Sequence, residues 1–165
     1  MIVTIKRNNK PSPFLLVQVG DLPPKECELG EKIELKGVER IEVENLFHLL
    51  TMKQKVSLID WAYKALPPEG QLRITVPSWC HSRSFIDPGV QWPPVSGDFF
   101  MLTNKKFREL NFPHVEMVCD YIPVVDVGYD SQHPDMAGRN EETKGFMFRN
   151  YINAALTLVA TLKKV

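Results

Sequence analysis

The stretch that decides the fold is residues 38–77, which read VERIEVENLFHLLTMKQKVSLIDWAYKALPPEGQLRITVP. A β-rich run at its start, a helix-capable run in its middle and an alternating apolar run at its end predict a strand-helix-strand unit. At about forty residues, the unit has the size of one crossover between parallel strands. Because such sheets bind ligands beyond the carboxyl ends of their strands, residues 44–48 and 77–87 are expected to matter most.

The middle of this unit predicts an amphipathic helix between residues 52 and 66. Its apolar side chains recur at helical spacing. They are Val56, Ile59, Ala62, Tyr63 and Leu66. Thr51 is expected to cap the helix, with Gln54 at the capping-box offset, and the two prolines at 67 and 68 end it. Residues 72–76 then alternate apolar and polar, which is typical of a strand.

The rest of the chain predicts one α/β domain that spans residues 1–165. Further strands are expected at residues 2–5 (at a sheet edge), 14–19, 32–37, 40–43, 115–118, 121–125 and 154–162. A second helix is expected at residues 104–110, capped by Thr103 and packed through Phe107 and Leu110. Residues 22–30, 78–97 and 128–145 are interpreted as loops. This order indicates a sheet with an antiparallel end.

Composition excludes several classes of protein. Lys and Arg together number 20, as do Asp and Glu, so net charge gives no case for nucleic acid or an anionic membrane as a partner. No apolar run is long enough to span a bilayer, and the first residues lack the apolar core of a signal peptide. Three dispersed cysteines, Cys27, Cys80 and Cys119, argue for a reducing compartment and against a disulfide framework or zinc site. A cytoplasmic protein is expected.

Three motifs in residues 46–77 are similar to those of one family. Residues 46–49, Leu-Phe-His-Leu, have the spacing of a Leu-Glu-His-Leu motif. Residues 66–70, Leu-Pro-Pro-Glu-Gly, stand where that family has Leu-Lys-Pro-Gly-Gly, and the following strand ends in Val-Pro at residue 77. On these motifs the chain resembles the compact class I S-adenosylmethionine-dependent methyltransferases of the bacterial and phage kind.

Three further segments extend the resemblance from residue 14 to the C-terminus. Residues 16–21, Leu-Val-Gln-Val-Gly-Asp, occupy the place of the family's first strand and Gly-rich turn, with a single glycine. Residues 87–90, Asp-Pro-Gly-Val, correspond to its Asp-Pro-x-His segment without the histidine. Residues 154–163 are similar to its final strand.

The resemblance implies a shortened Rossmann-like methyltransferase fold, with a mostly parallel sheet and an antiparallel C-terminal strand. Because residues 20–38 are too few for a full strand, helix and strand, the second and third strands and their helices are expected to be shortened or lost. The implied activity is methyl transfer from S-adenosylmethionine to an unknown acceptor, small or macromolecular. The alternative is a catalytically inactive protein of the same fold that acts as a binding or scaffold protein. The oligomeric state is left open, with a homo-oligomer as one option.

The resemblance also implies site residues. The cofactor would lie against Gly20, Asp21, Glu34, Glu44 and Asn45. The catalytic residues facing the acceptor would be His48, His81 and Asp87. A histidine with a pKa near neutral can remove a proton from a methyl acceptor, and methyl transfer itself needs mainly alignment.

Each of these residues also has an ordinary structural interpretation. Gly20 and Asp21 favour turns in any protein, and Asn45 can cap a helix. His48 can pack between its apolar neighbours, and loops collect polar residues such as His81 and Asp87 regardless of function. Residues 130–135, Asp-Ser-Gln-His-Pro-Asp, are interpreted as a solvated loop, so no metal site is expected. The sequence has no G-x-S-x-G elbow and no P-loop.

Overall fold

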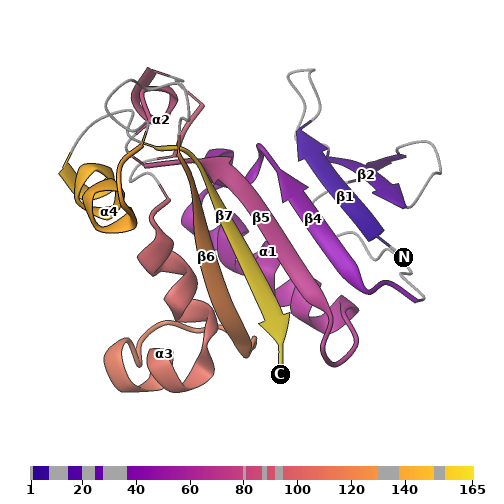
Figure 1. Ribbon diagram of the computed structural model, residues 1–165. Coiled ribbons are helices and arrows are strands. Elements are labelled where there is room, and N and C mark those ends of the chain that lie inside the picture. Colours follow the sequence, from indigo (N-terminus) through magenta and orange to yellow (C-terminus); the bar gives the residue numbers. More distant parts are fainter. Residues whose placement is uncertain are drawn as a thin grey trace.

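The computed structural model describes residues 2–7, 15–19, 25–27, 37–79, 81–86, 89–91, 95–129, 138–150 and 155–165. These residues contain the strands β1 (Ile2–Arg7), β2 (Leu15–Val19), β3 (Lys25–Cys27), β4 (Arg40–Glu44), β5 (Gln71–Pro77), β6 (Tyr121–Tyr129) and β7 (Ala155–Lys164). They form one seven-stranded sheet in the order β3-β2-β1-β4-β5-β7-β6 (Figure 1).

Helical segments connect the later strands. They are η1 (Phe47–Leu49), α1 (Met52–Ala65), α2 (Arg83–Ile86), η2 (Gly97–Thr103), α3 (Lys105–Asn111) and α4 (Glu141–Asn150). In Figure 1, α1 lies behind the strands, and no described helix crosses the front of β1, β4 and β5. The described helices therefore cover these three strands on one face.

The middle of the sheet is parallel, as the sequence predicts. β4 pairs in parallel with β1 on one side and with β5 on the other. β7 is antiparallel to both β5 and β6. The fold is thus a mixed α/β, Rossmann-like sheet with its antiparallel strand near the C-terminus, and the predicted fold class is confirmed.

The direction of β2 differs from the prediction. β2 runs antiparallel to β1, with Val19 opposite Val3 and Leu15 opposite Arg7. Residues 14–19 were expected to be the first strand of the methyltransferase unit, but β1 is the strand beside β4, and residues 2–5 do not form an edge. The connection over residues 8–14 explains this, because a parallel return needs a dozen or more residues.

Several boundaries also differ. Residues 25–27, expected in a loop, form β3. Residues 141–145, also expected in a loop, form the first half of α4. Residues 115–118 are not a strand, and the Asp60 carboxylate accepts the amide N–H groups of Val118 and Cys119 at 3.1 Å each. Of the strand expected at residues 32–37, only Gly37 lies within the described residues, and it occupies a turn.

The second helix also differs in its cap and its packing. α3 is capped by the Asn104 side chain, which accepts the Phe107 N–H at 2.9 Å, instead of by Thr103. The Thr103 hydroxyl donates to the Phe100 carbonyl. Leu110, expected to pack, is 74% exposed, whereas Arg108 is buried.

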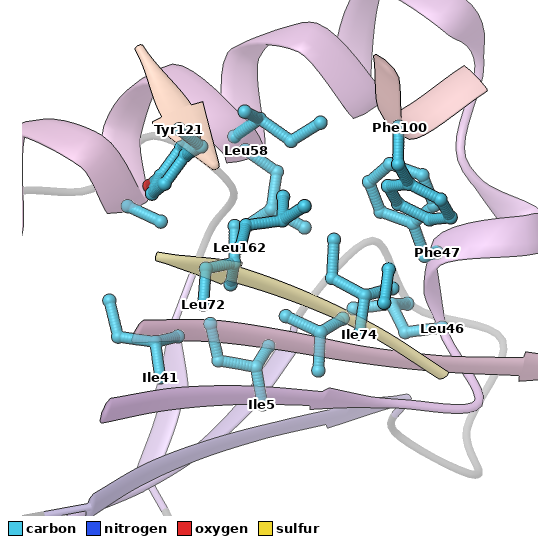
Figure 2. Close-up of a cluster of buried hydrophobic side chains, with 14 of the residues drawn as sticks. Ile5, Ile41, Leu46, Phe47, Leu58, Leu72, Ile74, Phe100, Tyr121 and Leu162 are labelled. Carbon is cyan, nitrogen blue, oxygen red and sulfur yellow. The ribbon is translucent and has the colours of Figure 1, made fainter. Parts of the chain in front are cut away.

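The core lies between α1 and the covered face of the sheet. Figure 2 shows Leu58 of α1 above Leu72, Ile74 and Leu162 of β5 and β7. All four are at most 1% exposed. At about 25 cal/mol per Å² of apolar surface removed from water, such side chains each stabilise the fold by about 1.5–3 kcal/mol. The alternation that predicted β5 therefore reflects one buried and one open face.

Both ends of α1 are fixed by hydrogen bonds. The Thr51 hydroxyl accepts the Gln54 N–H at 3.3 Å, and the Gln54 side chain accepts the Thr51 N–H at 2.9 Å, which is the predicted capping box. At the other end, the Lys164 ammonium donates to the carbonyls of Tyr63 and Leu66, both at 2.6 Å. A cation at this end also complements the helix dipole.

Replacing Lys164 by methionine is expected to lower the free energy of unfolding by about 2 kcal/mol, because two helix carbonyls lose a charged donor. Lys163→Met is the matched control, since within the described part of the chain the Lys163 ammonium pairs with Glu69, whose side chain is 71% exposed. Such surface pairs contribute about 0–1 kcal/mol. Urea unfolding measures both variants, and equal losses would contradict the capping role of Lys164.

Candidate functional site

The carboxyl ends of β1, β4 and β5 meet in one row. Lys6 pairs in register with Glu44, and Glu44 with Thr75. The Lys6 ammonium lies 2.8 Å from the Glu44 carboxylate. Their side chains are 53% and 38% exposed, so the pair lies at the surface. This edge is where open α/β sheets bind ligands.

Asn45 turns the chain sharply at the end of β4. Its φ is 50°, in the left-handed region that Asn tolerates better than most residues. Its N–H donates to the Thr75 carbonyl at 3.0 Å, which extends the β4–β5 pairing by one bond. Backbone geometry therefore accounts for Asn45, whose side chain is exposed.

His48 lies in η1, directly after this turn, and is 8% exposed. Its neighbour Phe47 is fully buried and packs 5.7 Å from both Phe99 and Phe100, measured between ring centroids. The His48 carbonyl accepts the Gln91 N–H at 3.0 Å, so residues 89–91 pack against η1. His48 is thus a packed residue at this candidate edge.

His81 lies in the tight turn that follows β5. Its N–H donates to the Ser78 carbonyl at 2.9 Å, and its own carbonyl accepts the Ser84 N–H at 2.9 Å. The buried Ser84 hydroxyl also donates to the Ser78 carbonyl, at 2.7 Å. These bonds wind the chain into α2 and hold the half-buried His81 just beyond the end of β5.

The remaining predicted site residues, Gly20, Asp21, Glu34 and Asp87, lie outside the described residues. Val19, which precedes Gly20, pairs with Val3 at the start of β1, whereas Lys6 and Glu44 lie at its other end. The structure therefore brings Glu44, Asn45 and His48 together but ends β2 at the opposite edge. The cofactor-binding turn at Gly20 remains a prediction. The direction of β2 does not support it, because β2 ends at the edge opposite to Glu44.

The sequence interpretation missed two buried charged side chains, those of Arg108 and Lys55. Lys55 is 3% exposed and continues the apolar stripe of α1 that includes Leu58 and Ile59. Its ammonium lies 6.0 Å from the centroid of the Phe47 ring, and burial lowers its pKa. The signal was available, because Lys55 falls three and four residues before those two apolar positions.

Other reaction chemistries find little support in the part of the chain that the structure describes. Burial, reinforced by the nearby Asp60, raises the pKa of the Cys119 thiol to about 12, so it is not a nucleophile at neutral pH. No group of three or more His, Cys, Asp or Glu side chains there can hold a metal ion. No described helix is both long and apolar enough to cross a membrane.

No protein-family model matches the chain, and no curated protein is significantly similar in sequence. Among solved structures, a SAM-dependent methyltransferase from Archaeoglobus fulgidus is similar over 80% of this chain, with a TM-score of 0.54 and 11% identity. The chain has a methyltransferase-like fold. It spans 62% of that protein's length.

Two other solved methyltransferases align less well. One is the putative methyltransferase in a complex with the Haloferax volcanii Trm112 activator, with a TM-score of 0.49 and 11% identity over 82% of this chain and 57% of that one. The other is the small RNA methyltransferase HEN1, with a TM-score of 0.44 and 9% identity over 79% of this chain and 14% of that one.

The described residues do not fit S-adenosylmethionine in the manner that the resemblance implies. The family uses glycines after its first strand to let the backbone approach the cofactor, and an acid after its second strand to hold the ribose. Here the strand beside β4 is β1, and the sequence contains no glycine before Gly20. β2 ends at Val19, at the opposite edge from Glu44. These residues therefore do not support a methyl-transfer step of the family's kind.

Replacing Lys55 by methionine is expected to raise the free energy of unfolding by about 1–2 kcal/mol near neutral pH, because methionine avoids burying an ammonium group. The folded state binds this proton less tightly than the unfolded chain does. The cost is therefore fully present below the lowered folded pKa, fades as the pH rises from there, and is gone above the ordinary value of 10.5.

Urea unfolding of both proteins at about pH 7 and about pH 10 checks this, with Lys53→Met, on the exposed side of α1, as the matched control. A difference between Lys55→Met and the parent that shrinks at the higher pH supports a buried, desolvated ammonium. A loss of stability, or a gain that does not change with pH, would show that the Lys55 ammonium is well solvated.

Proposed function

We propose that this chain is a binding or scaffold protein built on a methyltransferase-like fold, which does not hold S-adenosylmethionine as that family does. One observation carries the proposal: the antiparallel pairing of β1 with β2, which ends β2 beside Val3 and away from Glu44. The two segments that would enclose the cofactor therefore start from opposite edges of the sheet.

The open face of the sheet supports this proposal. Glu42 pairs in register with Thr4 and Arg73, and its carboxylate lies 3.7 Å from the Arg40 guanidinium and 3.9 Å from that of Arg73. These charges suit contact with water. The face therefore needs no covering layer of helices, which fits the expected loss of helices after the early strands.

The Lys6–Glu44 pair points the same way. S-adenosylmethionine carries a positive sulfonium, and the row at the ends of β1 and β4 already holds an ammonium 2.8 Å from its carboxylate. A cation placed there must compete with Lys6 for Glu44. The edge is better suited to a ligand that leaves this ion pair in place.

A thermal-shift titration with S-adenosylmethionine, backed by calorimetry, tests the proposal. A ligand at about one hundred times its Kd stabilises a protein by about 2.7 kcal/mol, which such a titration detects readily. We expect no shift and no heat at millimolar ligand. Saturable binding at micromolar concentrations would contradict the proposal.

A methyltransferase enzyme of the bacterial or phage kind, in the cytoplasm, is the second candidate. The grouping of Glu44, Asn45 and His48 at the carboxyl edge favours it. In that case the cofactor lies across the ends of β1 and β4, and His48, His81 and Asp87 face the methyl acceptor.

Paired variants distinguish this candidate if binding is found. Glu44→Gln is expected to weaken cofactor binding at least tenfold, because Glu44 is the carboxylate at the edge. Glu69→Gln is the matched control, since Glu69 lies in the turn that precedes the start of β5. Equal affinities in the two variants would place the ligand elsewhere.

A further inference from the structure

The first turn of α1 has unused hydrogen-bond donors at the candidate edge of the sheet. α1 begins at Met52, shortly after η1, which follows the carboxyl end of β4. The Thr51 hydroxyl accepts the Gln54 N–H, and the Thr51 carbonyl accepts the Lys55 N–H. Within the described residues, the N–H groups of Met52 and Lys53 have no acceptor. Both lie at the open end of the helix, where no earlier turn supplies a carbonyl.

No acid balances the positive end of the helix dipole. The first turn of α1 contains neither Asp nor Glu, although acids are the residues that this end favours. Residues 51–55 read Thr-Met-Lys-Gln-Lys, so the charged residues here are Lys53 and Lys55. A helix N-terminus with free N–H groups and positive neighbours attracts an anion.

Lys55 adds an ammonium group that is buried but has no acceptor. The residue is 3% exposed. In the part of the chain that the structure describes, its ammonium forms neither a hydrogen bond nor an ion pair, and it lies 6.0 Å from the centroid of the Phe47 ring. Its Nζ is also not one of the fully shielded polar atoms that lack a partner there. The tip of this otherwise buried side chain therefore reaches the surface.

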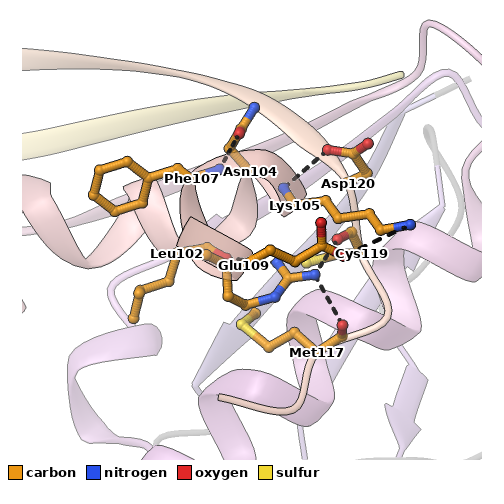
Figure 3. A network of polar contacts seen from close by, with 9 residues as sticks. Leu102, Asn104, Lys105, Phe107, Glu109, Met117, Cys119 and Asp120 are labelled. Carbon is orange, nitrogen blue, oxygen red and sulfur yellow. Dashed lines mark hydrogen bonds and ion pairs between the residues drawn. The ribbon is translucent and has the colours of Figure 1, made fainter. Parts of the chain in front are cut away.

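Two other cations in the described residues show how this protein normally satisfies such groups. Arg108 is 5% exposed, and its guanidinium donates to three carbonyl oxygens at 2.7, 2.9 and 3.1 Å (Figure 3). The Lys164 ammonium donates to two carbonyls at the end of α1. A buried charge is costly unless it is paired or hydrogen-bonded. Lys55 differs from both, and an acceptor from outside the chain can fill this gap.

The Lys55 ammonium lies at the same end of α1 as the free N–H groups. Helical side chains lean toward the N-terminus, and residues three or four apart are neighbours, so Lys55 shares a face with Thr51 and Met52. Phe47, over whose ring the ammonium lies, belongs to η1 and precedes the helix. The side chain of Lys55 is thus directed back along α1 to its first turn.

We propose that the first turn of α1 binds a phosphate group, which accepts hydrogen bonds from the N–H groups of Met52 and Lys53 and from the ammonium of Lys55. The several acceptor oxygens of a phosphate suit donors that come from the helix end and from its side. The buried ammonium, which is expected to cost stability in the free protein, gains an acceptor in the complex. Inorganic phosphate and small organic phosphates share this chemistry.

This site goes beyond the proposed function and does not require it. Phosphate and S-adenosylmethionine are titrated separately, so each proposal can fail alone. Saturable binding of S-adenosylmethionine would contradict only the proposed function, and a failure to bind phosphate would contradict only the site at α1.

Two-dimensional NMR of the isotope-labelled protein tests the site with inorganic phosphate, phenyl phosphate and phenol. Chloride keeps the ionic strength constant, so that general screening does not change during the titration. Either phosphate probe is expected to shift the amide signals of Met52 and Lys53 saturably. Tighter binding of phenyl phosphate identifies an organic phosphate as the ligand, and equal or weaker binding identifies the free ion. No saturable shift with either phosphate, or the same shifts with phenol, would overturn the proposal.

Lys55→Met is the decisive variant, because it removes the ammonium and keeps an apolar side chain that suits a buried position. It is expected to weaken phosphate binding about tenfold or more, since a charged hydrogen bond is lost. Lys64→Met is the matched control, because it removes the same charge from an exposed position in the last turn of α1. This control is expected to bind phosphate as the parent does. Unchanged affinity in Lys55→Met, or an equal loss in Lys64→Met, would contradict the assignment.

Discussion

The burial of one apolar stripe of α1 against β4 and β5 is the constraint on which the rest of the structure depends. Leu58 packs over Leu72 and Ile74, and Ile59 belongs to the same buried cluster. The capping box and Lys164 fix the two ends of the helix. The parallel pair that results brings Glu44 level with Thr75. The same pairing fixes the candidate edge at one end of the sheet and the start of β6 at the other.

The sequence allowed this unit to be predicted because its signals are local. Helical spacing, a capping box and strand alternation all lie within residues 38–77, and each is present in the structure. The direction of β2 could not be predicted in this way, because it depends on pairing with β1 and not on residues 15–19 themselves. Likewise, the polar sequence of α4 lacks a strong apolar stripe, and the burial of Arg108 depends on carbonyls of Met117 and Cys119.

In this chain the fold is separate from the placement of the residues that the resemblance assigns to the cofactor. The sheet and its parallel core are methyltransferase-like, and the similarity to the Archaeoglobus fulgidus enzyme extends over most of the described architecture. The position of the residues that would hold the cofactor depends on how the chain continues after β1 and β2. A seven-residue connection, residues 8–14, is long enough to reverse the chain but too short for a helical crossover. A short connection therefore preserves the sheet and moves the end of β2 to the other edge.

The pairing of β1 with β2 is the central claim, and nuclear Overhauser contacts between their α protons test it most directly. Antiparallel pairing predicts short α-proton contacts between opposite residues, at Thr4 with Gln18 or at Ile5 with Val17. It also predicts that Val19 lies near Val3. Contacts that place Val19 beside Lys6 would show a parallel pair, bring the end of β2 to the edge that holds Glu44, and contradict the claim.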